Sequence, residues 1–100
     1  MAKYFYVYIL ASSRNGTLYT GMTSNWQKRM TEHKEHQVAG FTDTYDITRL
    51  VYIERHETFN AAATRESQIK AWHRKWKIRL IQELNPEWED LTEKQDFCIS

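Results

Sequence analysis

The sequence predicts a small α+β domain in which apolar strands are followed by helices. Residues 4–10 are all apolar, and most are aromatic or β-branched, which is typical of a strand. Asn15-Gly16 follows them, and this dipeptide favours a hairpin turn because both residues tolerate positive φ. Two later segments have the features of helices, and Asn85-Pro86 ends the second of them. Together these features predict one mixed domain.

The first strand is predicted to lie in the middle of the sheet. Its even positions and its odd positions are both apolar, so both of its faces are expected to be covered. One face comprises Tyr4, Tyr6, Tyr8 and Leu10, and the other comprises Phe5, Val7 and Ile9.

The return strand of the hairpin is expected over residues 17–23. With Asn15-Gly16 as a two-residue loop, Tyr8 would pair with Thr23. Even positions of the first strand then share a face with odd positions of the second, and only an odd shift in register would break this relation. The predicted common surface comprises Tyr8, Tyr19, Gly21 and Thr23.

A helix is predicted over residues 26–36, with Ser24 or Asn25 as its cap. Arg29 and His33 are four residues apart and are therefore neighbours on its surface. One stripe of this helix comprises Trp26, Met30 and His33. A short loop containing Gly40 is expected to follow.

A strand is predicted over residues 48–55, and a helix capped by Thr58 or Asn60 runs from there to about residue 72. A further helix is predicted over residues 74–84, and the pattern leaves open whether the two helices are continuous. Trp72 and Trp76 are expected in the core, although their basic neighbours also allow base stacking.

Charge is distributed unevenly along the chain, although the net charge is only +1. Residues 1–79 carry 13 Lys and Arg against 7 Asp and Glu, whereas residues 80–100 carry one Lys against six acids. We therefore predict a domain over residues 1–88 and an acidic tail over residues 89–100. The basic cluster, which would suit phosphate binding or simply form a solvated helix face, comprises Lys70, Arg74, Lys75 and Lys77.

Several classes of protein are disfavoured by composition. The single Cys98 excludes an internal disulfide and a metal site of several cysteines. The sequence contains no apolar run long enough to cross a membrane and no signal-peptide pattern, so we expect a cytoplasmic protein without membrane attachment.

Glu66 is unusual because it falls on the apolar stripe of its predicted helix. A buried carboxylate is costly unless a cation or hydrogen bonds compensate it. One interpretation is an ion pair with Arg65, Arg29 or Lys70, or a helix edge that leaves the carboxylate in water. The other is a ligand for Mg²⁺, which is commonly held by one carboxylate together with waters and substrate phosphate.

These residues occur in an order that resembles the GIY-YIG nucleases, over roughly residues 4–84. The matching set comprises Tyr8, Tyr19, Gly21, Arg29, His33 and Glu66. Tyr6 and Thr20 depart from the two three-letter motifs, as in small bacterial members, and Asn85 is the candidate for the family's late Asn. The resemblance implies a three-stranded antiparallel sheet flanked by helices.

The resemblance also implies a metal-dependent endonuclease that hydrolyses phosphodiester bonds of DNA. Glu66 would hold Mg²⁺ or Mn²⁺, Arg29 would bind the phosphate, and His33 would relay a proton or bond a phosphate oxygen. Tyr8 or Tyr19 would orient or deprotonate the attacking water, and the sequence does not choose between them. The alternatives are a nucleic-acid-binding module with little cleavage activity and a protein-interaction domain. A targeting partner protein, the form of the substrate and the oligomeric state stay open.

Overall fold

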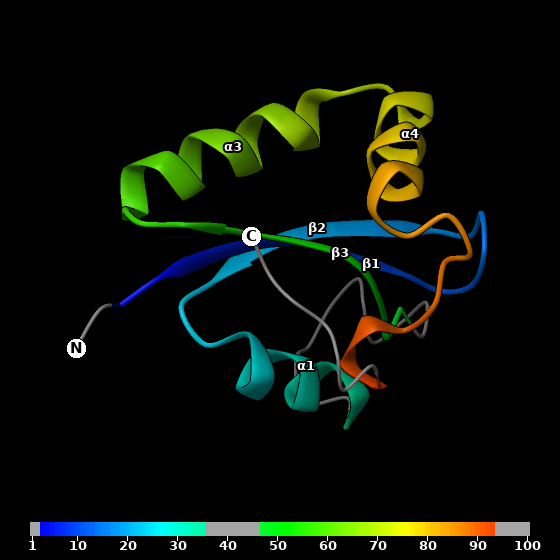
Figure 1. The fold of residues 1–100 in the computed structure, drawn as a ribbon, viewed down its shortest axis with the longest axis horizontal. Helices are drawn as coiled ribbons and strands as arrows, with labels where there is room; N and C mark the ends of the chain where they lie inside the picture. Colours follow the sequence, from blue (N-terminus) through cyan, green and yellow to red (C-terminus); the bar gives the residue numbers. More distant parts are fainter. Residues whose placement is uncertain (1–2, 36–46, 94–100) are drawn as a thin grey trace.

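Three strands form an antiparallel sheet with the order β2-β1-β3 in the computed structural model (Figure 1). The structure describes residues 3–35 and 47–93. Its strands are β1 (Phe5–Ala11), β2 (Leu18–Thr23) and β3 (Arg49–His56). Its helices are α1 (Trp26–Lys34), α3 (Phe59–Ala71), α4 (Arg74–Leu84) and the short 3-10 helix η1 (Leu91–Glu93). The predicted α+β class and the antiparallel sheet flanked by helices are confirmed.

β1 is the central strand, as its two apolar faces predict, and each face packs against a different layer of helices. In Figure 1, α3 and α4 lie on one side of the sheet and α1 lies on the other. On the α3 side the buried residues include Val7, Ile9, Val51, Ala62, Ile69 and Ile81. On the α1 side they include Tyr8, Leu10, Met30, Leu50 and Ile53. The sheet therefore separates two cores.

The hairpin register differs from the predicted one by two residues. Tyr8 pairs with Gly21 rather than Thr23, because the loop comprises four residues, 13–16, instead of two. The backbone amide of Gly16 donates to the Ser13 carbonyl at 2.9 Å, and Asn15 adopts a φ of 58°. A shift of two residues preserves the face of every side chain, so Tyr8, Tyr19 and Gly21 remain on the predicted common surface.

Side-chain caps define where α1 and α3 begin. Asn25 accepts a hydrogen bond from the Lys28 amide at the start of α1, and Thr58 accepts one from the Ala61 amide at the start of α3. α3 ends at Ala71, and the ψ of 151° at the next residue, Trp72, turns the backbone out of the helix before α4 begins. The helices are thus separate. The predicted end of the first helix at residue 36 and the loop at Gly40 lie outside the described residues.

Only one of the two tryptophans at this break packs as a core residue. Trp72 packs at the edge of the core on the α3 side, whereas Trp76 is 52% exposed. The prediction that Trp76 lies in the core is therefore wrong. The break after α3 changes the direction of the chain, so the four-residue spacing of the two indoles does not place them on one helical face.

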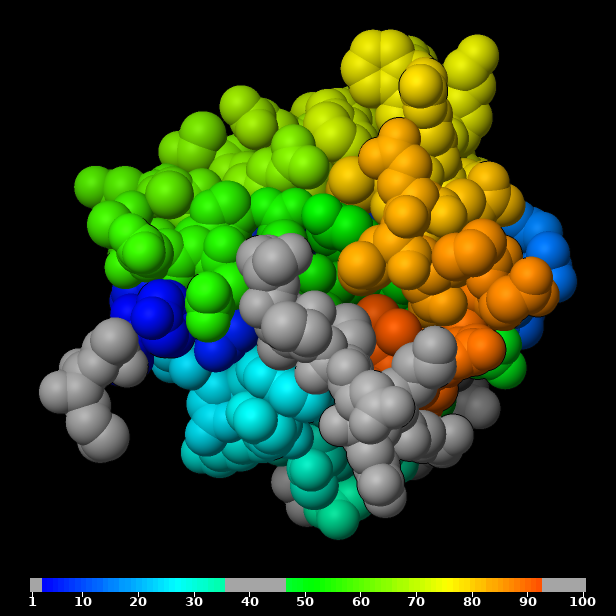
Figure 2. Space-filling view, viewed as in Figure 1, coloured from blue at the N-terminus to red at the C-terminus, as the bar shows by residue number. Residues whose placement is uncertain are grey.

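The segment after α4 runs along the side of the molecule towards the α1 layer (Figures 1 and 2, orange). Trp88 is fully buried with a φ of 56°, and its carbonyl accepts a hydrogen bond from Arg49 at 3.1 Å. Leu91 is also buried, and Asp90 pairs with Lys34. The first residues of the predicted acidic tail thus pack on the domain. Its remainder, with Cys98, lies outside the described part, within which no helix could cross a membrane.

Candidate active site

Tyr8 lies against the backbone of its cross-strand partner, Gly21. A Cβ atom on Gly21 would lie 2.5 Å from both Cζ and Oη of Tyr8. Tyr8 itself is only 2% exposed, so its ring has little room to move aside. Gly21 is therefore required here for steric reasons, because any side chain would occupy the space of the phenol.

Three rings from three elements meet beside Gly21, and we call them the ring cluster: Tyr8 of β1, Tyr19 of β2 and His33 of α1. The centroids of Tyr8 and Tyr19 lie 6.4 Å apart. His33 lies 6.0 Å from Tyr8 and 5.8 Å from Tyr19 in edge-to-face arrangements. Oη of Tyr8 lies 3.3 Å from Nε2 of His33, within hydrogen-bonding distance. The structure thus brings together three of the predicted site residues.

Arg29 lies one helical turn before His33. Its Nε atom is buried and has no hydrogen-bond partner among the described residues. The nearest acid is Glu32, whose Oε1 lies 3.7 Å from Nε, and the Arg29 side chain is 40% exposed. A buried donor without an acceptor is costly. Arg29 is therefore poised to bind an anion that can accept from Nε and from the rest of the guanidinium.

The ring cluster holds both of its hydrogen-bonded members in their neutral forms at neutral pH. Burial is the main cause of a raised pKa at Tyr8, and the neighbouring Tyr19 raises it further while Arg29 opposes the shift. Burial also lowers the pKa of His33, with Arg29 adding to the effect and Glu32 opposing it. A protonated phenol therefore faces a neutral imidazole. With its proton on Nδ1, His33 accepts the Tyr8 hydroxyl proton at Nε2.

Glu66 belongs to α3, on the opposite side of the sheet from Arg29 and His33. α3 packs against β2, which is the edge strand that carries Tyr19 and Gly21. Although the sheet lies between them, the negative charge of Glu66 contributes to the raised pKa of Tyr8. The charges of a carboxylate on the α3 side of the sheet and of a guanidinium on the α1 side therefore both act on the Tyr8 phenol.

The Glu66 side chain is 21% exposed, and its carboxylate lies 3.4 Å from Nζ of Lys70. Of the three predicted ion-pair partners, this structure shows Lys70. Arg65 is engaged elsewhere, since its Nε donates to both carboxylate oxygens of Glu54 on β3 at 3.2 and 3.1 Å. That contact fastens α3 to β3.

The residues around Glu66 fit a metal ion that is bound together with substrate. In the described ranges no group of three or more His, Cys, Asp or Glu side chains could hold a metal. A site at Glu66 would therefore supply one protein carboxylate. Mg²⁺ is commonly bound in this way, with waters and substrate phosphate completing the octahedron, whereas a structural zinc site requires four protein ligands.

The predicted basic cluster lies at the end of α3 and the start of α4, and its members differ in their contacts. Lys70 pairs with Glu66, and Nζ of Lys77 lies 3.5 Å from the Lys70 carbonyl. Arg74 donates to the carbonyls of Asn15 and Gly16 at 2.6 and 2.7 Å, so it fastens α4 to the hairpin loop. Lys75 is exposed and contacts no acid within the described residues.

Asn85 occupies a structural position between the sheet and the segment after α4. Its side-chain amide donates to the carbonyls of Val51 at 3.2 Å and Glu89 at 2.8 Å. Its Oδ1 accepts from the Glu89 amide at 3.1 Å. These bonds use the side chain to join β3 to the segment after α4, and the match of Asn85 to the family's late Asn stays a prediction.

Glu32 was missed in the sequence analysis. It neighbours Arg29 at 3.7 Å and its charge raises the pKa values of both Tyr8 and His33. The spacing of three residues between Arg29 and Glu32 on a helix is a signal that would have identified this pair.

The chain matches the family model of the GIY-YIG catalytic domain over residues 4–79. It is similar to a UPF0213 protein of Natronomonas pharaonis, with 41% identity over 81% of this chain and 94% of that protein. It is also similar to a UPF0213 protein of Staphylococcus aureus, with 40% identity over 78% of this chain and 94% of that protein.

A solved structure gives the same result for the fold. The solution NMR structure of a UPF0213 protein from Bacillus halodurans is similar to this one, with a TM-score of 0.56 and 27% sequence identity. The similarity covers 95% of this chain and 99% of that chain. The sheet and helices described above therefore recur in a protein of the same group.

Proposed function

This chain belongs to the GIY-YIG nuclease superfamily, and from that premise we propose that it is a metal-dependent endonuclease that hydrolyses phosphodiester bonds of DNA. The proposal includes a cytoplasmic location and allows for a partner protein that selects the target. The observation that carries it is the ring cluster beside Gly21 together with the Arg29 Nε, a buried donor that has no hydrogen-bond partner among the described residues.

Arg29 binds the scissile phosphate in this proposal. A phosphate oxygen would accept from Nε, which lacks an acceptor among the described residues. The guanidinium would then stabilise the negative charge that develops on phosphorus-bound oxygens in the transition state. Lysine could not replace it, because an ammonium group offers no planar fork of donors.

The Tyr8–His33 pair takes up the proton of the attacking water. The raised pKa of Tyr8 makes a free phenolate costly, so the phenol acts together with His33. The water gives a proton to Oη of Tyr8 as the phenol proton passes to Nε2 of His33. The water oxygen then bonds to phosphorus, the P–O bond to the leaving sugar oxygen breaks, and solvent supplies the proton of the new hydroxyl. Tyr19 packs against His33 and lines the approach.

Glu66 would hold Mg²⁺ or Mn²⁺, which when bound supplies Lewis-acid stabilisation of the phosphate and the leaving oxygen. The ion pair with Lys70 would have to open for this role, and because the Lys70 side chain is 54% exposed, water can replace Glu66 as its partner. After the pair opens, Lys70 is free to contact a neighbouring phosphate.

One observation favours the alternative of a binding module with little cleavage activity. Glu66 already has a cation partner in Lys70 at 3.4 Å. If that ion pair is retained on DNA, no carboxylate remains for the metal, and the protein would bind DNA without hydrolysing it.

The test is cleavage of plasmid, branched and single-stranded DNA in Mg²⁺, Mn²⁺ or EDTA, with Glu66→Gln as the matched variant of similar shape. We expect metal-dependent cleavage that the substitution abolishes while DNA binding in EDTA is retained. Binding without cleavage in every metal would support the binding module. Equal cleavage by both proteins would refute the role of Glu66.

A further inference from the structure

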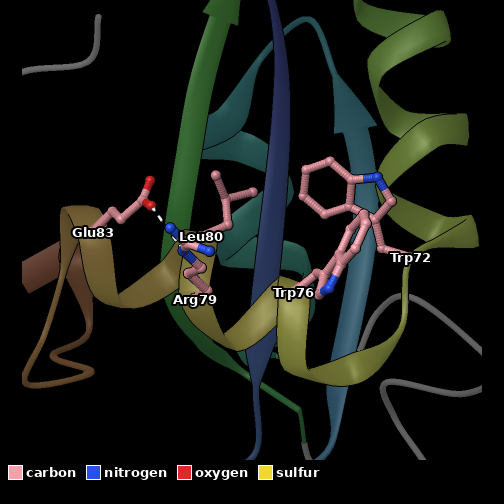
Figure 3. A pocket seen from close by; sticks show the side chains of 5 residues that line it. All are labelled: Trp72, Trp76, Arg79, Leu80 and Glu83. Atoms are coloured by element: carbon pink, nitrogen blue, oxygen red, sulfur yellow. Dashed lines mark ion pairs between the residues drawn. The ribbon is translucent and has the colours of Figure 1, made fainter.

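A pocket of about 270 Å³ lies where α3 passes into α4, outside the ring cluster (Figure 3). Its lining comprises Trp72, Trp76, Arg79, Leu80 and Glu83. In Figure 3 the two indoles stand together at one end, and the ion pair of Arg79 and Glu83 lies at the other. No step of the proposed hydrolysis uses these residues.

The two indoles form an aromatic wall in which Trp72 contacts a fixed neighbour and Trp76 is open to solvent. Their centroids lie 6.0 Å apart with an interplanar angle of 71°. The guanidinium of Arg65 lies 5.1 Å from the centroid of Trp72 and is held in turn by Glu54. Trp76 is 52% exposed. An indole left in water beside a fixed second indole is the surface expected of a binding site rather than of a core.

Basic residues neighbour Trp76 in the sequence, and one of them lines the pocket. Lys75 and Lys77 flank Trp76 in the sequence, and Arg79 lines the pocket itself. The acid in the lining, Glu83, lies 3.6 Å from Arg79, but both side chains are mostly exposed, so this pair is weak and readily exchanged for another anion. Aromatic faces among cations suit a ligand that combines a flat ring with a phosphate.

We propose that this pocket receives one unpaired nucleobase, with the neighbouring lysines holding the phosphates attached to it. The inference rests on the proposed function in taking a nucleic acid strand as the substrate. A base within a duplex has its faces covered by its neighbours, so only an unstacked base can present a face to an indole. The volume suits one ring system, because pockets for drug-sized ligands begin at about 300 Å³.

The position of the pocket connects it with the candidate active site. Ala71, the last residue of α3, follows Glu66 by five residues, which at a rise of 1.5 Å per residue is roughly 7.5 Å along the helix axis. The pocket begins at the next residue, Trp72, and so lies beyond the end of the helix that carries Glu66. Branched, flapped or single-stranded DNA is therefore the substrate class, rather than an intact duplex.

The experiment measures binding in EDTA, so that no cleavage occurs. Fluorescently labelled single-stranded DNA, the same strand with abasic nucleotides, and an end-closed duplex are titrated with wild-type protein, Trp76→Ala and Trp76→Phe. Phe59→Ala is the control, because Phe59 is also an exposed aromatic, at 54%, and lies at the start of α3, whereas the pocket lies beyond the end of that helix.

We expect Trp76→Ala to weaken single-strand binding by about 5- to 150-fold and to leave duplex binding unchanged. Trp76→Phe keeps an aromatic ring, so its affinity for single-stranded DNA should lie between those of wild type and Trp76→Ala. Phe59→Ala should bind as tightly as wild type does. Abasic nucleotides cause a similar loss. The two losses are not additive, because each removes the same stacking contact.

Three results would overturn the inference: no loss with Trp76→Ala, an equal loss for single strand and duplex, or additive losses with abasic DNA. If Trp76→Ala instead abolishes self-association in light scattering without changing DNA affinity, the pocket is a protein contact. Cleavage and binding separate the two proposals. If Trp76→Ala selectively weakens single-strand binding but no Glu66-dependent cleavage occurs, the nuclease proposal alone is refuted. If Glu66-dependent cleavage occurs but Trp76→Ala does not selectively weaken single-strand binding, the base pocket alone is refuted.

Discussion

Gly21→Ala is the substitution that most directly tests the packing of the candidate site. The added methyl group would lie 2.5 Å from Cζ and Oη of Tyr8, whereas carbon atoms in contact normally lie about 3.5–4.0 Å apart. The ring must therefore move by roughly 1 Å. Since Tyr8 is 2% exposed and packs between Tyr19 and His33, it has no free direction in which to do so.

The expected loss in the free energy of unfolding follows from three contributions. Overpacking of a buried site costs about 1–3 kcal/mol. Displacing the phenol from His33 removes a hydrogen bond that is worth about 0.5–1.5 kcal/mol. Alanine is better than glycine inside a strand by about 0.5–1 kcal/mol. The net destabilisation is then about 2 kcal/mol, which lowers Tm by about 8–16 °C in a domain of this size.

The assay is urea and thermal unfolding followed by circular dichroism, in the wild-type and Tyr8→Leu backgrounds. Leucine removes the ring atoms that the methyl group meets. In that background Gly21→Ala should be neutral or should stabilise the protein, and the difference between backgrounds is the coupling energy of the pair.

Equal destabilisation by Gly21→Ala in both backgrounds would refute this explanation, because the clash would then lie elsewhere. An unchanged Tm in the wild-type background would also refute it. DNA cleavage by Gly21→Ala should also fall, because the displaced phenol no longer reaches His33. Cleavage is measured well below the unfolding temperatures of wild type and variant, so that both proteins are folded.

Three further predictions concern charge and protonation. Glu66→Gln should abolish cleavage yet change the free energy of unfolding by less than about 1 kcal/mol, because the lost ion pair is partly solvated on its Lys70 side; a large drop in Tm would show a structural role. Lys75→Ala should lower the slope of log K against log salt for duplex DNA by about 0.9, and an unchanged slope would exclude a phosphate contact. Because burial and Arg29 lower the pKa of His33, cleavage should hold down to about pH 6.5 and decline only below it. The contribution of neutral His33 to the free energy of unfolding is complete above that pH and is lost as the pH falls below it. If the decline of cleavage at low pH persists in His33→Gln, protonation of His33 is not its cause.

Much of the local structure could be predicted because neighbouring residues determine it. The apolar faces of β1 identified a central strand, and Asn25 and Thr58 cap helices as expected. The shared face of Tyr8 and Tyr19 was correct although the register was not, because a difference of two residues preserves the alternation of side chains. The loop length was missed, since Asn15-Gly16 suits both two-residue and four-residue loops.

Contacts between layers could not be predicted in this way. Trp76 has the spacing of a core residue, but the break at Trp72 redirects α4 and leaves its indole exposed. The lack of a hydrogen-bond acceptor for Nε of Arg29 among the described residues depends on how α1 packs against the sheet. That the charge of Glu66 helps to raise the pKa of Tyr8 depends on the packing of α3 on the sheet, which no periodicity in the sequence records.

The division of the candidate site between two layers has a consequence for the newly made chain. The hairpin and α1 are synthesised first, and they carry every group of the ring cluster together with Arg29. The carboxylate arrives later, on α3, which follows β3 in the chain. In the proposed mechanism a nascent or proteolytically shortened chain could therefore hold phosphate but could not hydrolyse it.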